Sequence, residues 1–448
     1  MRNLFYPAYP VFDKLTGKSI LLARSVFLRF FLSFSPFLCL PLFGKVQGAG
    51  EVRGSSGKSG KVPGDPKRKE KKNFGVFSPL PPSDCSLQNQ EFMMKKETVL
   101  TLPPVPGNPR NSEGAFLRLL DNRILFVYSR YCGGERESGD DAPCDLAARI
   151  SGDGGRTWDD SDRILISHGD DSLNVMSVSL LRVKPEGRIL MVYLRKFADE
   201  KGRVNCVPCA VFSEDEGETW TTPVQISGSD GYFVVNNDRL LQLEGGRILV
   251  PAAWHRGTAG GHDRRAIGIF FLSDDGGRTF HEASDWILPP QSSGTGLQEP
   301  GVVETQPGYL TAFFRSDQGC QMISRSSDGG EHWSTPQPSN FLSPVSPMAL
   351  KRDPFDGKKF WAVWNDASGQ WKLPSPKESS WKRTPLVLAI GKDINSMTSE
   401  LLESDPGCVY CYTAMHFEEN CVLLAYCCGG DSPGESVLQK TRIVRISR

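Results

Sequence analysis

The chain lacks several features that mark common protein classes. It has no net charge, because 52 Lys and Arg residues balance 52 Asp and Glu residues. No long amphipathic helical pattern runs through the region after residue 95. The balanced charge gives no support to binding of nucleic acid or of an anionic membrane surface. The missing helical periodicity points away from helical and mixed folds.

An eight-residue pattern, Ser-x-Asp-x-Gly-x-x-aromatic, recurs four times. The copies occupy residues 151–158, 213–220, 273–280 and 326–333, so their starts lie 62, 60 and 53 residues apart. Asp and Ser side chains can hydrogen-bond the backbone of a tight turn, and Gly supplies a residue with positive φ. The pattern therefore predicts a turn in a repeated unit, and a fifth, degraded copy falls due at residues 391–395.

Six short apolar runs share this period. They are rich in aliphatic and aromatic residues and have the length of strands, at residues 123–128, 188–193, 247–254, 309–314, 359–364 and 421–426. Units of this size accommodate four strands each, so the sequence predicts an all-β, six-bladed β-propeller over residues 95–448. We expect the last strand, residues 441–447, to pair with one near residues 97–102 and close the ring.

The first hundred residues are of a different kind. Residues 1–50 contain basic residues followed by an apolar stretch at 26–43, which predicts a signal peptide or N-terminal hydrophobic segment. Residues 51–94 are a basic linker rich in Gly, Ser and Lys, which we expect to be disordered. The protein is accordingly expected to be secreted or periplasmic, and an uncleaved membrane anchor is the alternative.

The twelve cysteines leave several alternatives open. Cys206 with Cys209, and Cys408 with Cys411, have the spacing of metal or redox pairs, but the two pairs lie too far apart in sequence to indicate a zinc site. In an exported protein Cys132 could pair with Cys144, and buried free thiols are equally compatible with the sequence. We expect no metal and no organic cofactor.

The four repeats resemble the Asp-boxes of sialidases (neuraminidases), and six units is the number found in that superfamily. The resemblance to bacterial exo-sialidases covers about residues 95–448. It implies a retaining glycoside hydrolase that releases terminal sialic acid from glycoconjugates. The implied partner is a glycan, with no nucleic acid and no stable protein partner, and the chain is expected to be a monomer.

The resemblance is sharpest at Glu299 and Arg315, which are separated by sixteen residues as a catalytic Glu and a substrate-binding Arg are in bacterial sialidases. Sialidases bind the sugar's carboxylate with three arginines, whose planar guanidinium groups stay charged and pair bidentately with a carboxylate. The other two are expected to be Arg383 and Arg110. The usual Phe/Tyr-Arg-Ile-Pro motif is absent at Arg110, and Arg239 is a reserve candidate for the same pocket.

Two further roles follow from the resemblance. The acid/base is an Asp on the loop before the first repeat, for which Asp141 is the prediction and Asp140 and Asp145 are alternates. The nucleophile is a Tyr, an exception among glycosidases, and a neutral phenol approaches the carboxylate-bearing anomeric carbon with less repulsion than a carboxylate does. The spacing after the third arginine favours Tyr410 and leaves Tyr412 open.

Two other functions remain open on the sequence. One is a propeller glycosidase that acts on another acidic or neutral glycan, and the missing arginine motif favours it somewhat. The other is a non-catalytic propeller that binds glycan, because repeats of this kind do not by themselves establish activity.

Overall fold

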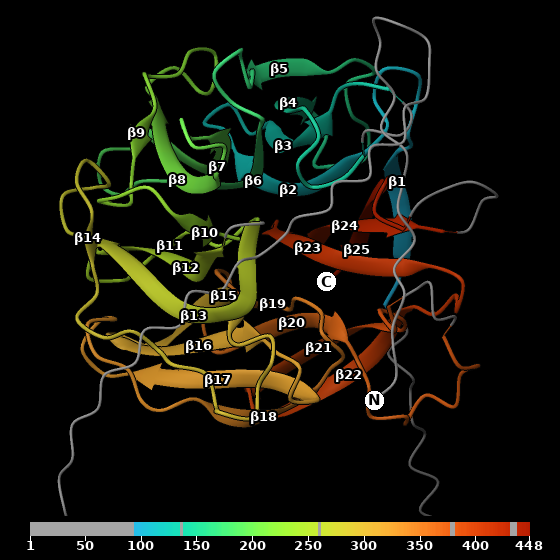
Figure 1. Ribbon diagram of the computed structural model, residues 1–448. Helices are drawn as coiled ribbons and strands as arrows, with labels where there is room; N and C mark the ends of the chain where they lie inside the picture. The colour runs from blue at the N-terminus through green and yellow to red at the C-terminus, as the bar shows by residue number, and fades with distance from the viewer. Residues whose placement is uncertain (1–93, 135–137, 259–260, 377–380, 431–436) are drawn as a thin grey trace, which may run out of the picture. The chain divides into compact units, whose positions relative to one another are not determined.

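The computed structural model describes residues 94–134, 138–258, 261–376, 381–430 and 437–448, which form an all-β propeller without helices (Figure 1). The chain divides into two compact units, Met1–Leu87 and Gln88–Arg448, and the described residues all belong to the second. The expected N-terminal segment and, apart from Met94, the basic linker lie outside the described residues. Within the described ranges, no helix has the length and apolar character needed to cross a membrane.

Hydrogen bonding groups the strands into five sheets. The first has four strands, β2 (Asn111–Arg118), β3 (Ile124–Tyr131), β4 (Cys144–Ser151) and β5 (Arg163–Ile166). The second has nine, β6 (Asn174–Arg182), β7 (Ile189–Ala198), β8 (Val204–Ser213), β9 (Val224–Gln225), β10 (Tyr232–Val234), β11 (Leu241–Gln242), β12 (Ile248–Thr258), β13 (Gly261–Ser273) and β14 (His281–Glu282).

The remaining three sheets have four strands each. One contains β15 (Gln298–Gln306), β16 (Tyr309–Arg315), β17 (Cys320–Ser326) and β18 (Gln337–Leu342). The next contains β19 (Ala349–Arg352), β20 (Phe360–Asn365), β21 (Leu386–Asp393) and β22 (Ser396–Glu403). The last contains β23 (Val409–Phe417), β24 (Cys421–Gly429), β25 (Thr441–Ser447) and β1 (Lys96–Leu102).

The prediction of six separate four-stranded blades needs a correction. Four blades are separate four-stranded sheets, and the second and third sequence units form one nine-stranded sheet. The join is the short strand β10, which runs antiparallel to β12 and also pairs in parallel with β8, through Tyr232 and Cys206. This strand lies in the connection between the two units, and no repeat or apolar run signals it.

The six apolar runs are all strands, as predicted. Each lies in the second strand of a sequence unit, in β3, β7, β12, β16, β20 and β24. In β24, for example, all nine residues are buried. Both faces of such a strand are covered because neighbouring sheets pack face to face, which explains continuous apolar runs in place of an alternating pattern.

The closing strand pair is confirmed. Strand β1 runs antiparallel to β25, with Lys96 opposite Ile446 and Leu102 opposite Thr441. The last sheet is therefore built from both ends of the described chain, and β1 supplies its outermost strand. The pair ties the first described strand to the last one, which closes the ring of sheets.

The four repeats form side-chain-locked turns between the third and fourth strands of their units. In the first, Ser151 Oγ donates to Asp153 Oδ1 at 2.9 Å and accepts from the Gly155 N–H at 2.9 Å. Asp153 Oδ1 also accepts from the Thr157 N–H at 2.9 Å. The other three repeats make the same bonds. The prediction that these segments are turns is confirmed.

The degraded fifth copy is not a turn of this kind. Residues 391–395 join β21 to β22, the equivalent place in their blade, but as a tight hairpin. Asp393 Oδ1 accepts from the Asn395 N–H at 2.9 Å. Position 391 is a Gly where the repeats have Ser, so the bonds that shape the other four turns cannot form.

Because of the aspartates in these turns, we expect the protein to lose stability in acid. Burial opposes ionisation at three of the four aspartates, but hydrogen bonds from the turn's own N–H and side-chain groups hold the pKa of each at about 2. The ordinary value is 3.8. Because the folded-state pKa is the lower one, the stabilisation is present above about pH 4 and is lost as pH falls toward 2.

Thermal melting of the protein and of Asp153→Asn across this range checks the expectation. The variant should melt at a lower temperature than the parent at pH 5, and the gap should shrink as pH approaches 2. A gap that does not change with pH would show that the ionised carboxylate does not stabilise the turn.

Candidate active site

Four strands near the centre of the propeller carry the same irregularity. A two-residue bulge interrupts each, in β2, β6, β15 and β23. The first bulged residue has positive φ in every case, at Glu113 (55°), Ser177 (56°), Glu299 (46°) and Tyr412 (59°). Positive φ is uncommon for residues other than Gly, and bulges near functional sites re-aim side chains. Strand β2 contacts both β6 and β23 (Figure 1), so these side chains are brought toward one another.

The bulge in β15 requires a glycine beside it. A Cβ on Gly301 would lie 2.2 Å from Cζ of the Phe313 ring on β16. We expect Gly301→Ala to lower the free energy of unfolding by about 1–3 kcal/mol, because a ring in a packed core cannot move away freely. Gly245→Ala is the matched control, since a Cβ there meets no atom within 4 Å. Denaturant unfolding of both variants checks this, and equal midpoints would contradict it.

Glu299, Arg315 and Tyr412 lie in direct contact. Arg315 Nη1 donates to Glu299 Oε1 at 2.5 Å, and the Tyr412 hydroxyl donates to the same oxygen at 3.3 Å. Burial and the Glu299 charge raise the pKa of Tyr412 well above its ordinary value, so the phenol is neutral. Glu299 Oε2 and Arg315 Nε are buried without a hydrogen-bond partner among the described residues. Buried polar atoms are normally paired, which suggests that a ligand completes this group.

Tyr410, predicted from spacing, lies elsewhere. Its ring is in the hydrophobic cluster between the last two sheets, 6.3 Å from that of Tyr426. In a regular strand Tyr410 and Tyr412, two residues apart, would lie on the same face. The bulge that follows Cys411 breaks this alternation and turns Tyr412 toward Glu299. The alternative tyrosine is therefore the one that contacts the other candidate residues.

Arg110 is buried just before β2 and is already held by acidic groups. Its Nη1 donates to Asp140 Oδ1 at 2.7 Å, and its Nη2 donates to Glu113 Oε1 at 3.3 Å. The guanidinium also lies 4.4 Å from the centre of the Tyr131 ring. Burial opposes the Arg110 charge, but its aromatic and acidic neighbours raise its pKa further above the ordinary value. It therefore stays charged.

Arg383 precedes β21 and faces Tyr412. Its guanidinium carbon lies 5.6 Å from the centre of the Tyr412 ring. Its donors meet weak acceptors, the Cys411 Sγ at 3.3 Å and the Val345 carbonyl oxygen at 3.4 Å, and its Nε has no partner among the described residues. A carboxylate is a stronger acceptor than either, so this arginine is free to pair with an anionic ligand.

The three candidate acid/base residues have different surroundings. Asp140 pairs with Arg110, and although burial opposes its ionisation, the Arg110 charge lowers its pKa. Asp141 is 70% exposed and lies 3.3 Å from the Lys196 ammonium nitrogen. Asp145 accepts from the backbone N–H of His168 at 2.9 Å and also faces its ring. Asp141 has the most exposed side chain and the longest ion-pair contact of the three.

Arg239, the reserve candidate, makes no hydrogen bond with this group among the described residues, and its Nε is buried without a partner there. It donates to the Met348 carbonyl oxygen at 2.7 Å and lies 5.5 Å from the centre of the Phe313 ring. It borders a cavity of about 330 Å³ toward the other ends of β15 and β19, lined by Glu304 and Arg352 among others. Burial lowers its pKa to about 10 despite the nearby acidic groups.

Sequence interpretation missed several residues that support the site. Glu113 binds Arg110 and accepts a hydrogen bond from Ser177. Lys196 is buried, and its ammonium group donates to the Asp140 carbonyl oxygen at 2.6 Å. Asn237 Nδ2 donates to the carbonyl oxygens of Gly114 and Tyr412, which joins three sheets. For Glu113 the sequence does hold a signal, because a Gly follows this Glu closely, at Gly114, as Gly301 follows Glu299.

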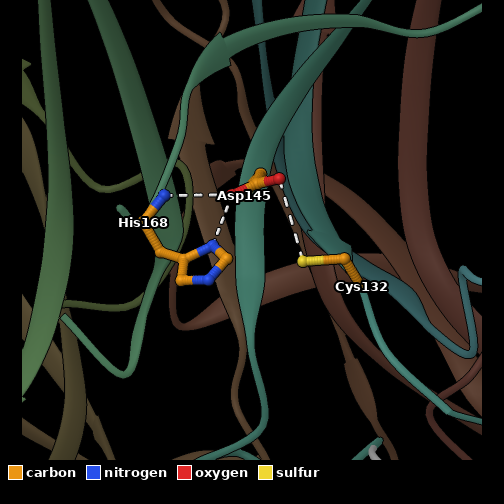
Figure 2. A group of neighbouring side chains, drawn as sticks. All are labelled: Cys132, Asp145 and His168. Atoms are coloured by element: carbon orange, nitrogen blue, oxygen red, sulfur yellow. Dashed lines mark hydrogen bonds and ion pairs between the residues drawn. The ribbon is translucent and has the colours of Figure 1, made fainter. Parts of the chain in front are cut away.

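One group of side chains in the described ranges could hold a metal ion, Cys132, Asp145 and His168 (Figure 2). Cys132 and Cys144 are both free thiols, so the disulfide that the sequence left open is not formed. The group lies at the ends of β3, β4 and β5, next to the connection that carries Asp140 and Asp141.

Comparisons with known proteins agree with this architecture. Residues 121–423, more than half of the chain, match the BNR repeat-like domain family. A search of curated protein sequences finds no significant match. Several solved structures share the fold at low sequence identity.

One is a protein of unknown function from Dyadobacter fermentans, with a TM-score of 0.61 and 17% identity over 78% of this chain and 99% of that one. The NanB sialidase of Streptococcus pneumoniae gives a TM-score of 0.57 and 12% identity over 78% and 70% of the two chains. The intramolecular trans-sialidase of Ruminococcus gnavus gives 0.57 and 14% over 78% and 96%. Identities this low support a shared fold but not a shared activity, which has to be argued from the site residues. The chain belongs to the BNR repeat-like domain family.

Proposed function

We propose that the protein is a retaining exo-α-sialidase that removes terminal sialic acid from glycoconjugates. The observation that carries the proposal is the contact of Tyr412 with Glu299, whose same oxygen is held by Arg315. A tyrosine–carboxylate pair surrounded by arginines is suited to a substrate whose reacting carbon bears a carboxylate, because the phenol attacks as a neutral group. The sugar carboxylate would be held by Arg110, Arg315 and Arg383.

The unpaired atoms at the site support this clamp. Arg315 Nε and Arg383 Nε are buried without partners among the described residues, and both guanidinium groups act electrostatically on Tyr412. At Arg110 the substrate carboxylate would replace Asp140, which is 65% exposed and can move away. A bidentate pair with a carboxylate is the strongest interaction that these guanidinium groups can make.

The proposed reaction has two steps. Tyr412 Oη attacks the anomeric carbon, its proton passes to Glu299, and Asp141 protonates the departing glycosidic oxygen. Asp141 then takes a proton from water, which attacks the same carbon while Glu299 returns the proton to the leaving Tyr412 oxygen. Two inversions give net retention of configuration.

Asp141 in the acid role leads to a leaving-group prediction. For Asp141→Asn we expect kcat/KM to fall by about 10²–10⁴-fold on a substrate with a sugar aglycone, which needs protonation to leave. The loss should be far smaller on an aryl substrate whose leaving group needs no proton. Asp140→Asn is the matched control and should show no such dependence on leaving group. If Asp140→Asn shows it and Asp141→Asn does not, the two roles are exchanged.

We further propose that the nine-stranded sheet acts as two blades, which gives six in all. The repeats at residues 213–220 and 273–280 each close one half of it, and one parallel residue pair joins the halves. Six blades would bring the arginines of the first, fourth and fifth blades around one centre with the tyrosine of the sixth.

The test is the release of a fluorogenic aglycone from α-linked N-acetylneuraminic acid by the purified protein, beside the same aglycone on neutral sugars. Turnover of the sialoside alone supports the proposal. Turnover of neutral glycosides alone would replace it with another glycosidase activity. Sialoside binding without turnover by folded protein would identify a non-catalytic glycan-binding propeller.

A further inference from the structure

Three potential metal ligands meet beside the acid/base loop. The Asp145 carboxylate lies between the other two side chains, with Oδ1 2.7 Å from His168 Nδ1 and Oδ2 3.8 Å from Cys132 Sγ (Figure 2). One donor atom of each residue lies within 4.8 Å of the other two. The geometry points to a binding site for a zinc-like divalent transition metal at Cys132, Asp145 and His168.

The separations are close to those of a tetrahedral centre. Metal–ligand bonds of about 2.0–2.3 Å place neighbouring donors about 3.3–3.8 Å apart. The sulfur–oxygen separation, measured to Oδ2, already fits, and the nitrogen–oxygen separation, measured to Oδ1, has to open by about 0.6 Å on this estimate. Three metal–ligand bonds in exchange for the two hydrogen bonds among these side chains can drive so small a movement.

The position of the ligands in the fold favours a common centre. Cys132 follows β3, Asp145 is the second residue of β4, and His168 follows β5, so adjacent antiparallel strands present all three at the same end of one sheet. The Cys132 N–H donates to the Pro143 carbonyl oxygen at 2.9 Å, which fixes the cysteine relative to the start of β4. The ligands are thus positioned by hydrogen-bonded backbone.

The donor types select the metal. Thiolate and imidazole suit zinc-like ions, whereas calcium and magnesium prefer sites made only of oxygen. Thiolate and carboxylate together supply two negative charges, which balance a divalent cation. The side chains of Asp145 and His168 are 14% and 26% exposed, so an ion can reach the site, and a water molecule can serve as its fourth ligand.

A nucleophilic role fits these residues less well. In a Cys–His–Asp arrangement the thiol faces the imidazole, which removes its proton. Here the sulfur faces the carboxylate, and the imidazole contacts that carboxylate from the other side (Figure 2). The imidazole is therefore not positioned to take the proton of the thiol.

A metal at this place would fasten the acid/base loop. Cys132 and Asp145 stand at the two ends of the connection that carries Asp140 and Asp141. The metal would hold the two ends of that loop together. It would thereby position the Asp140 and Asp141 carboxylates without contacting substrate. This consequence rests on the proposed function, whereas the binding itself does not.

The binding is tested on the full-length chain after chelator treatment under reducing conditions. Titration with Co²⁺ should give a thiolate-to-cobalt charge-transfer band that saturates near one equivalent and is removed by Zn²⁺. The band should be absent in Cys132→Ser and retained in Cys421→Ser, a control for a buried cysteine of β24. No band, or the same band in Cys132→Ser, would overturn the proposal.

A second measurement keeps the outcome independent of activity. Zinc should raise the melting temperature of the parent and of Cys421→Ser by a few degrees and leave that of Cys132→Ser unchanged, because only a ligand of the folded state stabilises it. Equal shifts in all three would also overturn the site. If cobalt binds as expected but no sialoside is cleaved, the metal site stands and the proposed function fails.

Discussion

Tyr412→Phe is expected to lower kcat on an α-linked sialoside by at least about 10³-fold, because loss of the nucleophile removes the covalent step. The change deletes one hydroxyl, whose one hydrogen bond within the described residues is the 3.3 Å contact with Glu299 Oε1. The melting temperature should therefore change little. Steady-state hydrolysis of a fluorogenic sialoside, beside thermal melting, checks both expectations.

Tyr410→Phe is the matched control on the same strand. Its ring packs in the hydrophobic cluster with Tyr426, so loss of its hydroxyl should change kcat by no more than a few-fold. Comparison of the two variants decides between Tyr412, which contacts Glu299 in the structure, and Tyr410, which the residue spacing favoured. If Tyr410→Phe abolishes turnover while Tyr412→Phe does not, the assignment of the nucleophile is wrong.

Arg383→Lys is expected to lower kcat/KM by about 10- to 100-fold, mainly through KM, since lysine keeps the charge but loses the planar fork that pairs bidentately with a carboxylate. Its unpartnered Nε and the weak acceptors of its Nη groups leave the Arg383 donors available to the substrate carboxylate. Hydrolysis rates across a range of sialoside concentrations separate the two constants.

Arg239→Lys provides the comparison for the arginine clamp. It is an equally buried arginine whose Nε also has no partner among the described residues. It differs in donating to the Met348 carbonyl oxygen and in bordering the cavity beyond the site. We expect the KM of the Arg239→Lys variant to stay within a few-fold of the KM of the parent protein. A matching rise in KM in both variants would indicate a general effect of altered packing, and the clamp would then lose its support.

The repeating parts of the fold were open to prediction because local chemistry specifies them. The Ser and Asp of each repeat bond their own backbone, and the apolar runs need only burial on both faces to be strands. The β1–β25 pair followed from the need to close the ring. Strand β10 could not be foreseen, since three residues in a connection carry no periodic signal and join two units through one parallel pair.

The resemblance to bacterial sialidases singled out Glu299 and Arg315 as residues of one site, and the structure brings them into contact at 2.5 Å. Residue spacing failed to choose between Tyr410 and Tyr412, because the choice depends on a bulge whose positive φ falls on a tyrosine. Gly or Asn usually marks such a conformation, and none stands at that position. Lys196 and Ser177 were missed for a related reason, since their partners come from other sheets.

The shared last sheet has a consequence for how the protein matures on the ribosome. Tyr412 lies on β23, whose sheet also needs β24, β25 and the early strand β1. Of the described strands β1 is synthesised first, and it can pair with β25 only after residues 441–447 have been made. Contacts so distant in sequence form slowly. A chain stopped before Thr441 would retain every candidate catalytic residue and yet have no complete sheet to hold the tyrosine.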